Sequence, residues 1–114
     1  MDLAIERRTE GTWTIIAVEG EIDLLTAPTL RDRVMKPLED GVFELVLDMS
    51  KVTFLDSSGL GVLVALHKRL RERDGRLVIV ATARPVLSVL NLTGLDKVFD
   101  VYSRLDEALT TAKP

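Results

Sequence analysis

Two kinds of apolar pattern alternate along most of this chain, and their order limits the possible folds more than any other feature. Short runs rich in β-branched and leucine residues at 43–47 and 76–81 are each followed by a segment with apolar residues every three or four positions. Strands that alternate with helices in this way lie parallel and are joined by right-handed crossovers. We therefore predict an α/β domain with a mostly parallel sheet.

The first part of the chain departs from this alternation. Residues 3–8 and 12–18 are both typical of strands, and Thr9-Glu10-Gly11 between them forms a short polar turn. The run that begins at Trp13 is too continuously apolar for an edge strand with one wet face, so we place it inside the sheet. The predicted sheet is therefore mixed, with an N-terminal hairpin.

Four stretches have helical periodicity with start and stop signals. The first is capped by Thr26, has Pro28 in its first turn and ends at Asp40-Gly41. Its predicted buried stripe consists of Leu25, Leu30, Val34 and Leu38. Together with the strands, about four helices complete the predicted α/β fold.

The remaining elements follow from the same signals. The second helix begins near Asp56 and runs to about residue 73, the third covers 85–93 with Gly94 as its C-cap, and the fourth covers 105–112. Residues 48–55 are predicted to form a loop and residues 97–102 the last strand. No linker or repeat interrupts this order, so we predict a single domain over residues 1–114.

Composition excludes several classes of function. The chain has no cysteine and a net charge of −3, which argues against thiolate or cysteine-metal chemistry and against a direct nucleic-acid role. Its first residues lack the basic-then-apolar order of a signal peptide, and its longest apolar run, at 60–66, is far shorter than the ~20 residues of a membrane span. We expect a cytoplasmic protein with no membrane partner.

One segment at a loop-to-helix junction has the residue types of a regulated site. It consists of Asp56, Ser57, Ser58, Gly59, Leu60 and Gly61. The first N–H groups of a helix lack intrahelical acceptors and favour an anion, so a phosphate on Ser57 can be held there without unfolding the domain. The alternative is that Asp56 and the serines only cap the helix. The two roles are compatible.

A helical projection of residues 57–72 separates a core face from an outer face. The core face carries Gly59, Leu63, Leu66 and Leu70. The outer face carries Ser57, Gly61, Val64 and Lys68, with Leu60 at its flank. A glycine inside a helix is destabilising by about 0.5–1 kcal/mol relative to alanine, so an exposed Gly61 favours close approach by another backbone. Tight packing of Gly61 against a neighbouring loop is the competing explanation.

Neither serine catalysis nor metal binding fits the residue pattern. A serine nucleophile needs a base within hydrogen-bond reach, whereas His67, ten positions along the same helix, lies about 15 Å from Ser57 and is expected on the helix surface. Asp23, Asp48 and Asp56 follow strands, but no adjacent acidic pair completes a magnesium site. We predict no catalytic residue, no cofactor and no metal.

The sequence resembles a known family at three motifs. These are Gly20-Glu21-Ile22-Asp23 with Thr26-Ala27, the segment Phe54-Leu55-Asp56-Ser57-Ser58-Gly59-Leu60-Gly61-Val62, and Thr93-Gly94-Leu95. Their order and spacing are similar to those of the bacterial STAS domains that antagonise anti-sigma factors, and the resemblance covers essentially the whole chain. The segment around Ser57 is its specific part.

The resemblance implies a function in protein binding. In that family the serine directly after the aspartate, by position Ser57 rather than Ser58, is phosphorylated by an anti-sigma factor that is also a serine kinase. The unphosphorylated form binds this kinase, and the sigma factor is released. Phosphorylation breaks the complex, and a serine phosphatase restores the unphosphorylated form. The expected partner-binding residues are Asp23, Asp56, Ser57, Ser58, Gly59, Leu60, Gly61, Val64 and Lys68. Asp23 is expected to orient the Ser57 hydroxyl or contact the kinase, or else only to cap the helix at Thr26.

Two other functions fit the same pattern. The first is a STAS subunit of another assembly, such as a stress-sensing scaffold or a lipid-transport complex. The second is a small enzyme or phosphate-binding protein that uses the region of Asp56. The identity of the co-purifying partner, or binding of a small ligand by the isolated domain, distinguishes these from a sigma-factor regulator.

Overall fold

The computed structural model describes residues 2–111 and contains one five-stranded sheet in the order β1-β2-β3-β4-β5. The strands are β1 (Ala4–Glu10), β2 (Trp13–Ile22), β3 (Glu44–Leu55), β4 (Arg76–Val80) and β5 (Asp100–Tyr102). The helices are α1 (Ala27–Glu39), α2 (Ser57–Arg71), α3 (Arg84–Leu92), the 3-10 turn η1 (Leu95–Lys97) and α4 (Leu105–Thr111). The predicted end of the last helix at Ala112 lies outside the described residues.

Strand directions confirm the predicted sheet. β1 and β2 are antiparallel, and the pairs β2–β3, β3–β4 and β4–β5 are all parallel. β2 lies between two neighbours, as its apolar sequence predicts. With four α-helices in residues 2–111, this is the mixed, mostly parallel α/β fold expected from the sequence.

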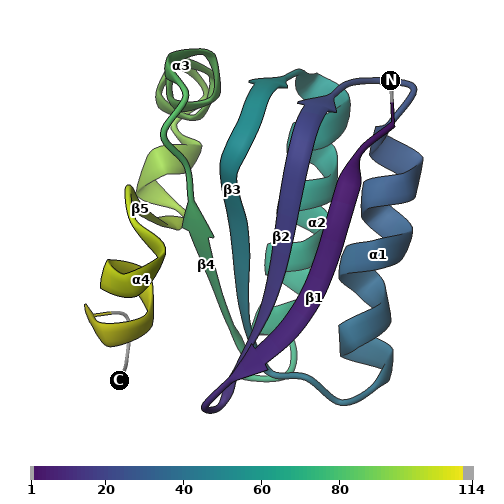
Figure 1. Cartoon of the computed structure of the whole chain (residues 1–114), viewed down its shortest axis with the longest axis vertical. Coiled ribbons are helices and arrows are strands. Elements are labelled where there is room, and N and C mark those ends of the chain that lie inside the picture. The colour runs from purple at the N-terminus through teal and green to yellow at the C-terminus, as the bar shows by residue number, and fades with distance from the viewer. Residues whose placement is uncertain (1, 112–114) are drawn as a thin grey trace.

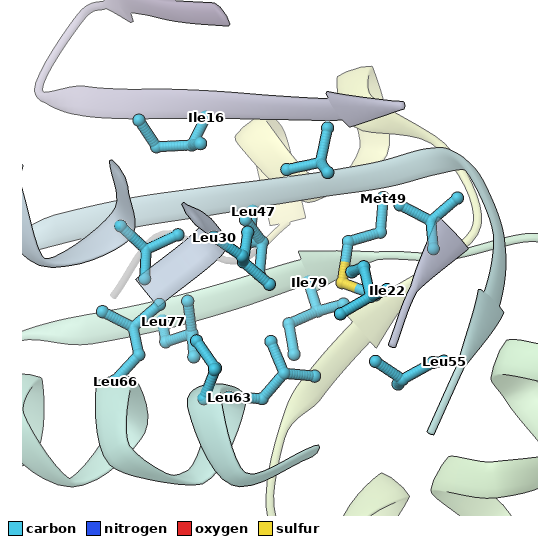
Figure 2. Close-up of a cluster of buried hydrophobic side chains, with 14 of the residues drawn as sticks. Ile16, Ile22, Leu30, Leu47, Met49, Leu55, Leu63, Leu66, Leu77 and Ile79 are labelled. Carbon is cyan, nitrogen blue, oxygen red and sulfur yellow. The ribbon is translucent and has the colours of Figure 1, made fainter. Parts of the chain in front are cut away.

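The main core lies between the sheet and the two long helices, α1 and α2, which cover the same face (Figure 1). Figure 2 shows strand residues such as Ile16 and Leu47 facing Leu30 of α1 and Leu66 of α2, all at most 1% exposed. Burial of each such side chain contributes roughly 1.5–3 kcal/mol, so this layer holds both helices against the sheet.

The opposite face of the sheet is only partly covered. Helix α4 packs through Ala108 on a second, smaller cluster of buried strand residues. Its strand members are Trp13, Ile15, Val46, Val78 and Val80. β1 and the upper parts of β2 and β3 lie beyond α4 (Figure 1), which allows polar residues such as Asp48 on that part of the face.

Three strand limits differ from the sequence predictions. β3 continues through the predicted loop 48–55, and β2 continues to Ile22, because the two strands remain paired to Ile22 and Leu55 with two register shifts. The predicted last strand is shorter, since η1 occupies residues 95–97 before β5. The helix ends at Asp40 and Gly94 are confirmed, and Gly94 has a left-handed φ of 75°.

Candidate functional site

The ends of β2 and β3 bring two loops together at one edge of the sheet. Ile22 is paired with Leu55, and the backbone N–H of Asp56 donates to the carbonyl of Ile22 at 3.1 Å. Figure 1 shows both arrowheads at the edge where α1 and α2 begin. The loop containing Asp23 and the first turn of α2 are therefore neighbours, as expected for parallel strands.

Asp56 is the N-cap of α2. Its backbone is extended, with φ −106° and ψ −172°, and its Oδ1 accepts the N–H of Ser58 at 2.9 Å and of Gly59 at 3.2 Å. This interaction satisfies two donors that a helix start leaves unpaired. The first residue of the helix, Ser57, is exposed, whereas Ser58 is half-buried.

The two faces of α2 agree with the helical projection. The buried face consists of Gly59, Val62, Leu63, Leu66 and Leu70. Ser57, Gly61, Val64 and Lys68 are exposed and Leu60 is half-buried. Lys68 lies three turns from Ser57, about 16 Å along the axis. The outer stripe is therefore continuous, with its serine and its lysine at opposite ends.

The two glycines of this helix start have opposite surroundings. A β-carbon added to Gly61 would meet no atom within 4 Å, so the competing explanation of tight packing does not apply to Gly61. A β-carbon on Gly59 would collide with side-chain atoms of Leu55 and Ile22. Gly59 thus lets α2 sit close to the ends of β2 and β3, while Gly61 leaves the outer surface flat.

Asp23 organises the neighbouring loop. Its Oδ1 accepts the backbone N–H groups of Leu25 and Thr26, each at 3.0 Å, and its own N–H donates to the Thr26 hydroxyl at 2.9 Å. The N–H of Thr26 in particular lowers the pKa of Asp23, with that of Leu25 adding to the effect. Within residues 2–111 no hydrogen bond joins Asp23 to Ser57. The N-cap of α1 is Thr26, whose side chain makes no capping hydrogen bond, so Asp23 orders the loop before the helix and its role toward Ser57 or a kinase stays a prediction.

The same loop contains two leucines that the sequence interpretation did not place in the site. Leu24 is 73% and Leu25 84% exposed, so the expected position of Leu25 in the buried stripe of α1 is wrong. Helix α1 begins at Ala27, and the turn formed by Asp23 ends the helical spacing before it reaches Leu25. The available signal was the spacing itself, since five positions from Leu25 to Leu30 place the two side chains about 140° apart around a helix.

His67 lies on α2, well away from the serines. Its ring contacts Phe99 edge-on, with ring centroids 5.4 Å apart, and the residue is half-buried rather than fully on the surface. Burial lowers the pKa of His67, and the positive charge of Arg71 lowers it further. Asp48 accepts the N–H of Ser50 at 3.0 Å. Among the described residues, no group of three His, Cys, Asp or Glu side chains is arranged to hold a metal ion.

A model of the STAS domain matches residues 4–108, nearly the whole chain. The chain belongs to the STAS domain family. Within the described part of this STAS domain, no helix has the length and apolar character needed to cross a membrane.

Named relatives of this STAS domain are regulators of sigma factors. It is 35% identical over 96 residues to the anti-sigma-F factor antagonist RsfB of Mycobacterium tuberculosis. This match covers 84% of the present chain and 78% of RsfB. It is 33% identical over 103 residues to the anti-sigma-B factor antagonist of Listeria monocytogenes, covering 89% and 90% of the two chains. The STAS domain therefore accounts for most of each of these relatives.

Solved structures give the same grouping. A crystal structure of an anti-sigma factor antagonist from Mycobacterium paratuberculosis superposes on this STAS domain with a TM-score of 0.89 and 36% sequence identity. The match covers 96% of this chain and 92% of that one. The element order and sheet topology described above are therefore those of a solved family member.

Proposed function

We propose that this STAS domain is an anti-sigma factor antagonist that is regulated at Ser57. Its unphosphorylated form binds an anti-sigma factor that is also a serine kinase, and the bound sigma factor is released. The observation that carries the proposal is the exposed Ser57 at the capped start of α2, in a chain similar to anti-sigma factor antagonists. A serine that is buried or within a strand would not give a kinase the same access.

Phosphorylation of Ser57 changes the surface while the fold is kept. The phosphate adds about −1.5 to −2 charges at the positive end of the α2 dipole, where the first N–H groups favour an anion. The same charge stands beside the carboxylate of Asp56 and near the apolar side chains of Leu60 and Val64. Docking an apolar surface there requires desolvation of the phosphate, which strongly opposes binding. The phosphorylated STAS domain should therefore stay folded and dissociate from its partner.

The proposed contact surface follows the outer stripe of α2. Ser57, Ser58, Leu60, Gly61, Val64 and Lys68 provide the surface, Asp56 and Asp23 hold its two loops, and the buried Gly59 acts indirectly. Because Gly61 has no side chain, a partner backbone can approach the helix closely. The contribution of Gly59 is to keep the helix start against Ile22 and Leu55.

The proposal assigns this chain the role of a substrate. A kinase modifies Ser57, a serine phosphatase removes the phosphate, and the STAS domain itself carries out no catalysis. Both reactions place the protein in the cytoplasm, where ATP and the sigma factor are available. No nucleic acid, membrane or cofactor takes part in this scheme.

Incubation with candidate anti-sigma factor kinases and ATP, followed by phosphopeptide mapping, tests the proposal. We expect one phosphate on Ser57, no phosphate on Ser57→Ala, and normal modification of the matched variant Ser58→Ala. The phosphorylated protein should no longer form a complex with the kinase that modified it. Modification at Ser58, Thr53 or Ser50, or equal affinity of both forms, contradicts the proposal. Stable capture within a membrane or scaffold assembly instead identifies a different STAS function.

A further inference from the structure

Leu24 and Leu25 form an exposed apolar pair next to the start of α2. They are 73% and 84% exposed, and they follow Ile22, whose carbonyl accepts the N–H of Asp56. At no more than about 3.5 Å per residue, Leu24 lies within about 7 Å of Ile22 along the chain. Their side chains are left in water by the fold, so the folded domain gains little from their apolar character.

The loop that carries the pair is held in one conformation. The Asp23 carboxylate accepts the N–H of Leu25, and the buried Thr26 hydroxyl donates to the carbonyl of Glu21 at 2.8 Å. The N–H of Ala27 also donates to the carbonyl of Asp23 at 2.8 Å. A loop fixed in this way loses little conformational freedom when it binds, which favours affinity. The two leucines are thus presented in an arrangement prepared for contact.

The charges around the pair limit what can cover it. Residues 20–26 include the carboxylates of Glu21 and Asp23 and no basic residue, and residues 53–66 include Asp56 and no basic residue. Glu19, earlier on β2, is paired instead with Lys51 of β3. In a symmetric dimer the same patch appears on both sides, so these acidic groups would face one another. Anionic membrane surfaces are repelled for the same reason. The chemistry instead fits a protein with an apolar socket and a basic rim.

We infer that Leu24 and Leu25 are the apolar anchor by which this STAS domain selects its anti-sigma factor. The inference rests on the proposed function and extends its contact surface from α2 to the β2–α1 loop. The pair enters an apolar socket on the anti-sigma factor, while Glu21, Asp23 and Asp56 meet basic groups at the socket's edge. An apolar centre within a polar rim is the usual arrangement of a protein interface, and a loop that is already ordered loses less entropy on binding.

The test uses the kinase that phosphorylates Ser57 and the double variant Leu24→Ser/Leu25→Ser. Leu92→Ser is the matched control, because Leu92 is also 84% exposed but lies at the end of α3. We expect the double variant to keep its melting temperature and to bind the kinase at least about tenfold more weakly. The control should bind as the wild type does.

Each other outcome overturns the inference in a recognisable way. If the wild type is phosphorylated on Ser57 and the double variant binds equally well, the anchor is wrong while the proposed function stands. If Leu92→Ser weakens binding as much as the double variant does, loss of any exposed leucine weakens binding, and Leu24 and Leu25 are not a specific anchor. A wild-type dimer in sedimentation that the double variant abolishes assigns the leucines to self-association. A wild type that neither binds nor is modified removes both the function and the anchor.

Discussion

A β-carbon added to Gly59 would lie 2.5 Å from Cγ2 of Ile22. Such a separation is too short for real carbon atoms, so α2 approaches the ends of β2 and β3 as closely as it does only because residue 59 is glycine. The backbone of Gly59 is helical and the residue is buried. Sequence requirements at this position are therefore set by packing.

Gly59→Ala is expected to destabilise the domain. Overpacking of this kind has a typical effect of about 1–3 kcal/mol, which exceeds the ~0.5–1 kcal/mol that alanine gains over glycine within a helix. Urea denaturation of the variant beside the wild type measures the difference. A variant as stable as the wild type would show that Ile22 and Leu55 can shift without effect.

Gly61 gives the opposite expectation two residues along the helix. With open space around the missing side chain, Gly61→Ala should raise stability by about 0.5–1 kcal/mol. Gly61→Leu should keep the fold and weaken binding to the anti-sigma factor kinase by at least about tenfold, because its side chain separates the two surfaces. Melting curves and affinities of both variants are the measurement. If stability and affinity fall together, the helix face has been assigned incorrectly.

Ser57 variants should separate binding from its regulation. Ser57→Ala is expected to bind the kinase as the wild type does and to remain bound in the presence of ATP. Ser57→Glu should bind more weakly than Ser57→Ala but more tightly than phosphorylated protein, since one carboxylate carries less charge than a phosphate of about −1.5 to −2. Calorimetric titration of the three forms checks this order. A different order removes charge as the cause of release.

The two hydrogen bonds accepted by Asp56 should be measurable as stability. Asp56→Ala leaves the N–H groups of Ser58 and Gly59 without their acceptor and should reduce stability by about 1 kcal/mol. Asp56→Asn keeps an acceptor oxygen and should lose much less. Denaturant titrations of both variants distinguish the cap from the charge, and equal losses would show that charge rather than hydrogen bonding matters.

His67 should make stability depend on pH. Its pKa in the folded domain lies below the unfolded value of 6.5, so the unfolded chain binds the proton more readily. The stability that His67 contributes is therefore present above pH 6.5 and is lost as the pH falls below it. From about pH 7.5 to about pH 5.5 the wild type should lose more stability than His67→Gln. Parallel losses would show that other groups cause the change.

The elements around the site differ in how well the sequence predicts them. The outer face of α2 follows directly from helical geometry, because Gly59, Leu63 and Leu66 are spaced for one buried side. The course of β3 does not, because Asp48 and Ser50 interrupt its apolar run. Those residues are tolerated within the strand because α4 leaves that part of the sheet face uncovered. Which part of a face is covered depends on tertiary packing, and the local sequence pattern does not contain that information.

The position of Leu25 shows a second limit of sequence patterning. Leu25 lies five positions before Leu30 and nine before Val34, about 140° and 180° away around a helix, so it does not share their buried side. Its side chain lies in water, and helix α1 begins only at Ala27. An apolar residue near a helix start belongs to the buried stripe only if its angle around the axis agrees with that of the others.

Helix α2 begins after the carboxylate of Asp56 and carries Lys68, Arg69 and Arg71 in its last turn. Its 15 residues separate these groups by about 22 Å. These full charges exceed the half charges of the backbone dipole that they oppose, so the net charge at the start of α2, beside Ser57, is negative. A basic partner that approaches this end is attracted before contact, and added salt weakens that attraction and slows the encounter.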